Sequence, residues 1–408
     1  MTERHRLEVA DVFRQYGETY LALHGASREQ RRVLRDVQNC RTAALGGHVE
    51  QCDRCGHQKI SYNSCRNRHC PKCQGSTRAR WLSARAAELL PTPYFHVVFT
   101  LPDVLGPLAL QNQAVVYGLL FQAVAETLQE VAANPRHLGA RLGFLTVLHT
   151  WGQNLMHHPH IHCVVPAGGL SMDGKTWVKS RQRFFLPVRV LSRVFRGKFT
   201  ALLKRAHGQG KLTFHGRLEP LACLRGMNRL LSQSVRHDWV VYAKRPFGGP
   251  ACVLKYLAQY MHRVAISNRR LLRMENGQVT FRWKDYARGN RQRTMTVQAT
   301  EFIRRFLLHV VPSSFVRIRY YGFLANRYRT QNLEHCRQLL GQRPHPESEA
   351  AAGALDVTDI ARKEKATGLC PVCHEGCLRT VQTLSPQRQP WQARRASCSV
   401  SARYSDTS

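Results

Sequence analysis

The stretch HHPHIHC, from His157 to Cys163, places four histidines within six residues. The apolar residues around it are typical of a buried strand, and side chains two apart on a strand share a face. His160 and His162 should therefore lie on one face, with Ile161 and Cys163 directed into the core. A lone histidine there is more often a hydrogen-bonded core residue, but two imidazoles on one face can chelate a metal ion.

A third metal ligand from this region must be neutral, because no acidic residue lies between Glu130 and Asp173. We expect Gln153 to supply it, with His158 as the second choice. Neutral ligands preserve the full charge of the ion, so that it can polarise a phosphodiester as a Lewis acid. The pattern thus predicts metal-assisted phosphoryl transfer.

A matching nucleophile lies in the segment 250–271, which begins with a proline, a residue that favours the first turn of a helix. At helical spacing its apolar residues form one stripe, and Tyr256, Tyr260 and Arg263 lie on the opposite face. Tyrosines spaced in this way usually pack in a core, but here the core-facing stripe is already occupied. Two phenols on a basic helix predict attack by tyrosine on a phosphate and a covalent phosphotyrosine. The expected DNA-contacting residues of this segment are Lys255, Arg269 and Arg270.

Two pairs of cysteines have the spacing of zinc ligands. Cys52 and Cys55 form one C-x2-C knuckle, Cys70 and Cys73 form another, and 14 residues separate the two pairs. Four thiolates at this spacing suit a tetrahedral structural Zn²⁺ better than they suit four buried thiols.

The fourth ligand of that zinc site has two alternatives in the intervening residues, Cys65 and His69. The same segment is basic, and we expect Arg66 and Arg68 to contact DNA phosphates. A further knuckle near the C-terminus gives half a zinc site without a partner pair, and its cysteines are Cys370, Cys373 and Cys377.

The residues GLSMDGKT, from Gly169 to Thr176, match the written pattern of a phosphate-binding P-loop. That loop requires a following helix, whose first amides hold the phosphates. The residues that follow here are aromatic, β-branched and partly alternating, so Asp173-Gly174 predicts a hairpin turn. We therefore expect no nucleotide cofactor.

The composition narrows the class of protein. The 408 residues include 61 Lys and Arg against 26 Asp and Glu, a formal charge of +35. Nucleic acid is the expected polyanionic partner, and an anionic membrane surface is the weaker alternative. The sequence has neither a long apolar run nor a secretory leader, which predicts a cytoplasmic protein associated with the bacterial nucleoid and not with a membrane.

Several elements must position these residues. We expect helices over residues 1–38 and 76–90, strands at 94–102 and 143–149, and an apolar helix ending at Asn134.

The predicted domains are a helical and zinc-binding region, 1–91, a nuclease region, 92–335, and a linker with a tail, 336–408. The tail from Ser385 lacks apolar periodicity, which predicts disorder.

The combination of these motifs resembles a known family. The histidine pair, the two tyrosines four apart, the segment HRVAISNRRL and the upstream YNSCRNRHCPKCQ together resemble the two-tyrosine HUH transposases of the IS ninety-one type. The resemblance covers about residues 10–330. It implies an α+β fold, in which a small helical zinc-binding domain precedes an antiparallel sheet flanked by helices, with the histidine strand at the centre.

The resemblance also implies roles for individual residues. His160 and His162 would bind Mg²⁺ or Mn²⁺, and Tyr256 and Tyr260 would cleave single-stranded DNA at the ends of the element. Each cleavage would leave a 5′-phosphotyrosine and a free 3′-hydroxyl. Two nucleophiles would let one chain hold two DNA ends during strand transfer.

Two other functions are compatible with parts of the sequence. A rolling-circle replication initiator would use the same nicking chemistry. A non-enzymatic, zinc-containing nucleic-acid-binding protein would explain the charge and the cysteines, but not two phenols turned away from the apolar stripe. A carboxylate-based transposase is disfavoured, because both candidate segments lack acidic residues.

Overall fold

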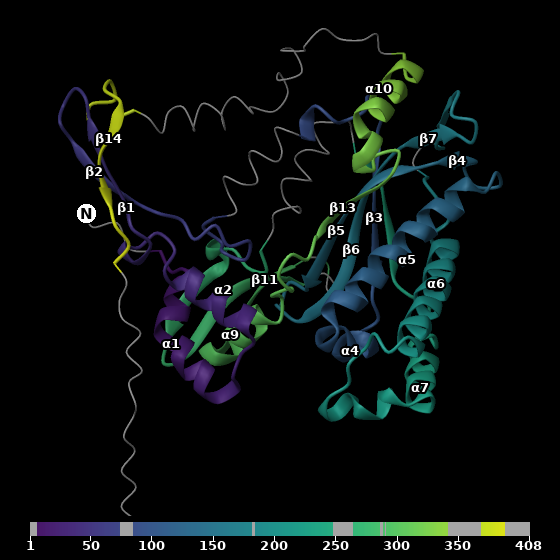
Figure 1. Ribbon diagram of the computed structural model, residues 1–408, viewed down its shortest axis with the longest axis horizontal. Coiled ribbons are helices and arrows are strands. Elements are labelled where there is room, and N and C mark those ends of the chain that lie inside the picture. The colour runs from purple at the N-terminus through teal and green to yellow at the C-terminus, as the bar shows by residue number, and fades with distance from the viewer. Residues whose placement is uncertain are drawn as a thin grey trace, which may run out of the picture. The chain divides into compact units, whose positions relative to one another are not determined.

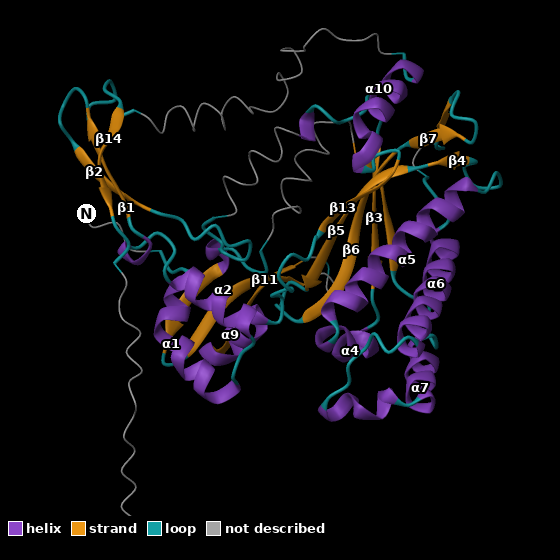
Figure 2. Ribbon diagram, in the orientation of Figure 1, coloured by secondary structure: helices purple, strands orange, loops and turns teal. Residues whose placement is uncertain are grey.

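A five-stranded antiparallel sheet carries the histidine strand at its centre (Figure 1). The strand order is β13-β5-β6-β3-β9, and β6 contains the HHPHIHC stretch. The strands are β3 (Tyr94–Thr100), β5 (Gly143–Trp151), β6 (His157–Pro166), β9 (Val241–Phe247) and β13 (Ile318–Gly322). Helices and antiparallel sheets together make an α+β fold, which confirms the predicted class (Figure 2).

The computed structural model describes residues 6–73, 85–181, 184–247, 264–285, 289, 291–341 and 369–387. The chain divides into two compact units. Unit 1 comprises residues 1–38 and 65–367, and unit 2 comprises residues 39–64 and 368–408. These units divide the chain at other residues than 91 and 335, and the predicted domain boundaries stay predictions.

Unit 1 includes the first two helices because their apolar sides pack against residues that come much later in the chain. Helices α1 (Val9–His24) and α2 (Arg28–Gln38) confirm the predicted helical start. Phe13 of α1 meets Phe306 edge-to-face at 5.1 Å, and Gln30 of α2 donates to the Leu307 carbonyl. Phe306 and Leu307 belong to α9 (Ala299–Leu307), so these long-range contacts, not sequence proximity, determine the unit.

The hydrophobic core of unit 1 lies between one face of the sheet and two long helices, α5 (Gln113–Ala133) and α6 (Val188–Gly208). Alternate residues of β3 and β6, such as Phe99 and Ile161, are fully buried against them. Phe99 meets Phe195 of α6 edge-to-face at 5.1 Å. Helix α5 ends at Ala133, directly before Asn134, as predicted. None of the described helices has the length and apolarity needed to cross a bilayer.

The predicted turn at Asp173-Gly174 is confirmed. It joins β7 (Gly168–Ser171) to β8 (Trp177–Lys179), which pair antiparallel. The Gly174 amide donates to the Ser171 carbonyl, and the Asp173 carboxylate accepts the Lys175 amide. A strand follows the motif, so the helix start that a P-loop requires is not present here.

The remaining elements of unit 1 are short. A second antiparallel sheet has the order β10-β11-β12, and a third has the order β4-β7-β8. The bounds are α4 (Gly106–Gln111), β4 (Ala140–Arg141), α7 (Leu224–Ser234), β10 (Leu271–Glu275), β11 (Gln278–Asp285), β12 (Arg291–Gln298) and α10 (Arg329–Leu339).

Unit 2 is a small three-stranded sheet with the order β14-β1-β2. Strands β1 (Gly47–Cys52) and β2 (Gln58–Tyr62) are neighbours in sequence, whereas β14 (Leu378–Leu384) comes from the far end of the chain. Both pairings are antiparallel. The C-terminal knuckle and the N-terminal knuckle of Cys52 and Cys55 thus belong to one unit.

Several predicted elements fall outside the described residues. They are most of the predicted helix 76–90, the tyrosine-bearing helix up to residue 263, the segment 342–368 and the tail from residue 388.

Candidate functional site

Strand β6, which contains the histidines, forms a hairpin with its neighbour β5. Three side chains from other parts of the chain contact backbone carbonyls of the turn between them. Arg270 donates to the Gln153 carbonyl, and Arg305 donates to the Asn154 carbonyl. His309 contacts the Leu155 carbonyl through Nε2 at 3.0 Å. Because burial lowers the pKa of His309 to about 3, its ring is neutral near pH 7 and Nε2–H can donate to that carbonyl. These contacts anchor the turn between β5 and β6.

The two faces of β6 have the predicted alternation. Ile161 and Cys163 are fully buried in the hydrophobic core. His160 and His162 lie on the other face, and His162 is 7% exposed. The alternation of residue types in the sequence therefore distinguished the residues that pack in the core from the candidate metal ligands on the other face.

A third imidazole joins the pair from the adjacent strand. His149 of β5 is directly opposite His160 in the antiparallel register, so both side chains point to the same face. The nitrogen atoms of His149, His160 and His162 that could bind a metal lie within 4.8 Å of one another. The His149 ring stacks on Trp151 at 4.7 Å, which orients it.

His149 was not among the ligands predicted from the sequence. The available signal was a histidine in an otherwise apolar strand, but its alignment with His160 depends on strand register, which one strand's sequence does not contain. The predicted third ligand, Gln153, lies in the turn after β5. The alternative, His158, precedes His160 by two residues and lies 3.5 Å from Asp103.

Hydrogen bonds at Nδ1 define how the histidine pair would bind a metal. His160 Nδ1 lies 2.6 Å from the His158 carbonyl, and His162 Nδ1 lies 2.8 Å from Nε2 of His96. A carbonyl only accepts, so His160 carries its proton on Nδ1 and presents the lone pair of Nε2. The contact with His96 allows the same tautomer of His162, in which Nδ1–H donates to His96. This is the outer contact that metal-binding histidines usually make.

His96 occupies a buried position on β3 beside the pair. Burial is the main reason why its pKa falls to about 3, with smaller contributions from Lys244 and His160. His96 is therefore neutral near pH 7, and its Nε2 can accept the proton of His162. His96 was not predicted from the sequence, because it lies 66 residues before His162.

These imidazoles are suited to a divalent cation. All three are neutral ligands, and imidazole accepts Mn²⁺ and later transition ions more readily than Mg²⁺. A cation at this site would keep its charge for an anionic substrate. The predicted clip of His160 and His162 thus extends to three side chains on two strands.

Replacing His96 should weaken metal binding without removing a ligand. We expect His96→Ala to raise the Kd for Mn²⁺ by roughly 10- to 100-fold, the usual cost of losing such an outer contact. His96→Gln, which retains an acceptor, should recover part of the affinity. Titration calorimetry measures both, with His237→Ala, an exposed histidine, as the control. Equal affinities for wild type and His96→Ala would contradict the positioning role.

The predicted nucleophiles lie outside the described residues, together with Lys255 and Arg263. Tyr256 and Tyr260 remain candidates from the sequence.

The four remaining basic candidates have different surroundings. Arg66 and Arg269 are exposed, as a phosphate contact requires. Arg68 donates to the Phe315 and Pro312 carbonyls, and Arg270 donates to the Arg282 and Gln153 carbonyls. These two arginines thus bind backbone carbonyls of other segments of the protein, which the sequence did not indicate.

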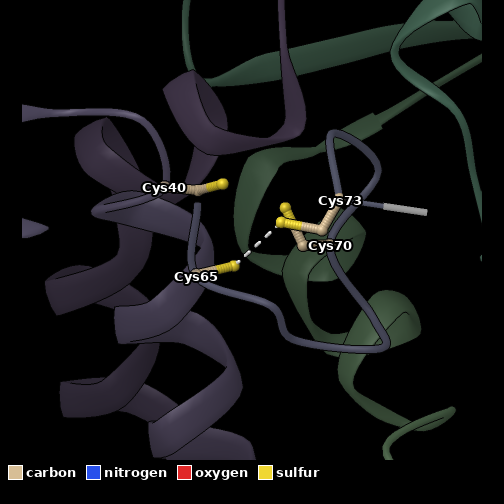
Figure 3. A group of neighbouring side chains, drawn as sticks. All are labelled: Cys40, Cys65, Cys70 and Cys73. Atoms are coloured by element: carbon tan, nitrogen blue, oxygen red, sulfur yellow. Dashed lines mark hydrogen bonds between the residues drawn. The ribbon is translucent and has the colours of Figure 1, made fainter. Parts of the chain in front are cut away.

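The structure distributes the predicted zinc ligands over two groups. Cys70 and Cys73 lie with Cys40 and Cys65 (Figure 3), and Cys65 Sγ lies 3.6 Å from Cys73 Sγ. Cys52 and Cys55 lie in another group, with Cys370 and Cys373.

In each group of cysteines the ligand atoms lie within 4.8 Å of one another. The structure therefore does not bring the four predicted ligands to one point. Of the two alternatives for a fourth ligand, Cys65 joins a group, and His69 belongs to neither group found among the described residues.

Comparisons with known proteins identify the family of the chain. A family model described as "Transposase zinc-binding domain" matches residues 12–101, and one described as "Putative transposase" matches residues 143–332. The chain is 57% identical over 380 residues to "Putative transposase y4qJ" of Sinorhizobium fredii (strain NBRC 101917 / NGR234), covering 92% of this chain and 95% of that protein. The chain belongs to the IS ninety-one transposase family.

A second relative supports the assignment. The transposase is 31% identical over 298 residues to "Transposase for insertion sequence element IS801" of Pseudomonas savastanoi pv. phaseolicola, covering 71% of this chain and 68% of that protein. None of the solved structures matches the transposase. Membership supports a general role in DNA cleavage and transfer, and the zinc-binding domain with its cysteine groups supports structural zinc.

Proposed function

We propose that the transposase cleaves single-stranded DNA at the ends of its own element by tyrosine attack, as in rolling-circle transposition. The observation that carries the proposal is the convergence of three imidazoles on one face of the central sheet. His160 Nδ1 donates to a carbonyl, so its lone pair is on Nε2, and His162 presents Nε2 in the same way when its Nδ1–H donates to His96. Such a set suits a cation that assists phosphoryl transfer better than it suits packing.

His149, His160 and His162 would hold the cation. A bound Mg²⁺ or Mn²⁺ would supply Lewis-acid polarisation of the scissile phosphate. Trp151 and His96 keep two of the imidazoles in position, through a ring stack and a hydrogen bond. The paired strands beneath the ligands make the site rigid, which lowers the cost of assembling it.

The proposed reaction is a transesterification that conserves the phosphodiester energy. The phenolic oxygen of Tyr256 or Tyr260 attacks phosphorus and forms a phosphotyrosine bond to the 5′ side. The bond from phosphorus to the 3′-oxygen breaks, and that oxygen takes up a proton to become a hydroxyl. Attack by a 3′-hydroxyl on the phosphotyrosine then joins the strands and regenerates the phenol.

The test is to detect the covalent adduct. Labelled single-stranded DNA from the element's ends is incubated with Mn²⁺ and the protein, and denaturing gels reveal any protein-DNA species. We expect an adduct with wild type and with each single variant, Tyr256→Phe and Tyr260→Phe, and none with the double variant. Tyr328→Phe, which alters an exposed tyrosine of the described chain, serves as the control. Binding by wild type without any adduct would overturn the proposal.

A further inference from the structure

We infer that Cys52, Cys55, Cys370 and Cys373 bind a second zinc ion, which joins the N-terminal and C-terminal parts of the chain into one module. The two family models end at residues 101 and 332, so neither includes Cys370 and Cys373. All four cysteines belong to unit 2. This inference does not depend on the cleavage mechanism.

The sulfur atoms have the spacing of a tetrahedral thiolate site. Cys52 Sγ lies 3.7 Å from Cys373 Sγ, and Cys55 Sγ lies 3.5 Å from Cys370 Sγ. Four sulfurs bound about 2.3 Å from zinc lie roughly 3.8 Å apart at the corners of a tetrahedron. A disulfide would need about 2.05 Å. Both short separations connect one knuckle to the other, as one shared ion requires.

The two knuckles have the same backbone turn although they come from opposite ends of the chain. The residue after the second cysteine is left-handed in both, with φ of 72° at Gly56 and 57° at His374. The amide of that residue donates to the carbonyl of the first cysteine, Cys52 or Cys370. Two segments that share this turn and face each other fit one tetrahedral site.

Backbone amides also surround the sulfurs. The amides of Arg54 and Cys55 lie 3.4 and 3.5 Å from Cys52 Sγ. The amides of Val372 and Gly376 lie 3.4 Å from the sulfurs of Cys370 and Cys373. Amide donors stabilise thiolates, the form that binds zinc, and they are common outer contacts of metal sites.

Contacts beyond the sulfurs hold the two knuckles in register. Cys52 pairs with Leu378 where β1 meets β14. Asp53 accepts the Cys377 amide at 2.8 Å and pairs with Arg379 at 3.2 Å. A Cβ on Gly376 would lie 2.4 Å from Cys52 Sγ, so only glycine fits there without rearrangement. The C-terminal knuckle is thus fitted closely to the N-terminal one.

Unit 2 needs such a ligand because its strands bury little. All of β2 and β14 is exposed or only partly buried, and β1 buries only its two end residues. Small domains without a sufficient apolar core depend on metals or disulfides, and zinc contributes directly to their folding. The exposed sheet therefore depends on the ion, and the ion requires residues from both ends of the chain.

Zinc content of the purified full-length protein tests the inference. The variant Cys370→Ser/Cys373→Ser should contain one zinc ion fewer per chain than wild type, and so should Cys52→Ser/Cys55→Ser. Combining all four substitutions should remove no further ion, because both pairs bind the same one. Cys377→Ser is the matched control, since Cys377 is exposed, lies in the same segment and is outside the group.

Two outcomes would overturn the inference. One is unchanged zinc content after the loss of Cys370 and Cys373. The other is that Cys52→Ser/Cys55→Ser and Cys70→Ser/Cys73→Ser remove one and the same ion, as the sequence-based grouping predicts.

A measurement on wild type avoids the risk that a variant misfolds. Thiol alkylation followed by mass spectrometry reports which cysteines are accessible. Cys55 is exposed but should resist alkylation until a chelator is added, and Cys370 and Cys373 should become reactive with it. Cys377 and Cys223, both exposed, should react throughout. Rapid alkylation of Cys55 and Cys373 in zinc-loaded protein would contradict the site.

Discussion

Replacing both His160 and His162 should abolish DNA cleavage while single-stranded DNA is still bound. If the bound cation lowers the barrier by about 4 kcal/mol, its loss reduces the cleavage rate by roughly 10³-fold. Binding should persist, because phosphate contacts come mainly from basic side chains elsewhere. Because His162 contacts buried His96, we would replace both histidines by glutamine, which retains a polar group for that contact.

The measurement pairs a cleavage assay in Mn²⁺ with fluorescence anisotropy of the same labelled oligonucleotide. The exposed-residue variant His237→Ala should behave as wild type in both. Cleavage by the double variant at the wild-type rate would eliminate the metal role.

The same assay distinguishes between the candidates for the third ligand. If His149 binds the ion, His149→Gln should raise the Mn²⁺ concentration required for half-maximal cleavage, and Gln153→Ala should change it little. The reverse result would restore Gln153 as the ligand.

Replacing Gly322 by alanine should cause a large loss of stability for the addition of a single methyl group. Gly322 has φ of 60°, and a Cβ there would lie 1.7 Å from the Leu142 carbonyl oxygen. Its strand pairs with β5 at Gly143, so the clash involves backbone atoms that cannot move aside easily. We expect Gly322→Ala to lower the free energy of unfolding by at least about 3 kcal/mol.

Thermal unfolding followed by circular dichroism would show this loss as a decrease of roughly 6–12 °C in the midpoint. The matched control is Gly208→Ala at the end of α6, where an added Cβ meets nothing within 4 Å. That change should leave the midpoint unchanged or raise it slightly, because alanine favours helices. A change of about 2 °C in the midpoint corresponds to roughly 1 kcal/mol of unfolding free energy. If the midpoint of Gly322→Ala lies within about 2 °C of the wild-type midpoint, the strand relaxes around the added methyl group and the prediction is wrong.

Sequence patterns were sufficient to predict features that depend only on residues close together in the chain. The alternation around Ile161 predicted which face of β6 is buried, because successive strand residues point to opposite sides. Asp173-Gly174 predicted its turn, because these residue types favour that backbone geometry. The apolar helix ending at Asn134 followed from the proline that comes next.

The zinc groups show why the other assignments could not be made in this way. C-x2-C spacing identifies a knuckle, but every knuckle has that spacing, so it cannot say which two share an ion. Nearness in sequence favoured Cys52 with Cys70, whereas Cys52 instead meets Cys373, which is 321 residues away. The pairing of β1 with β14 decides this match.

The sequence by itself determined that this chain has paired histidines on one strand face, cysteine knuckles, a strongly basic composition and the motifs of its transposase family. The tertiary structure decided that His149 completes the imidazole cluster, that His96 orients His162, and which cysteines meet. The physical reason is that a ligand set is defined by distances of a few ångströms. Strand register and long-range packing set those distances, and the spacing of residues along the chain predicts neither of them.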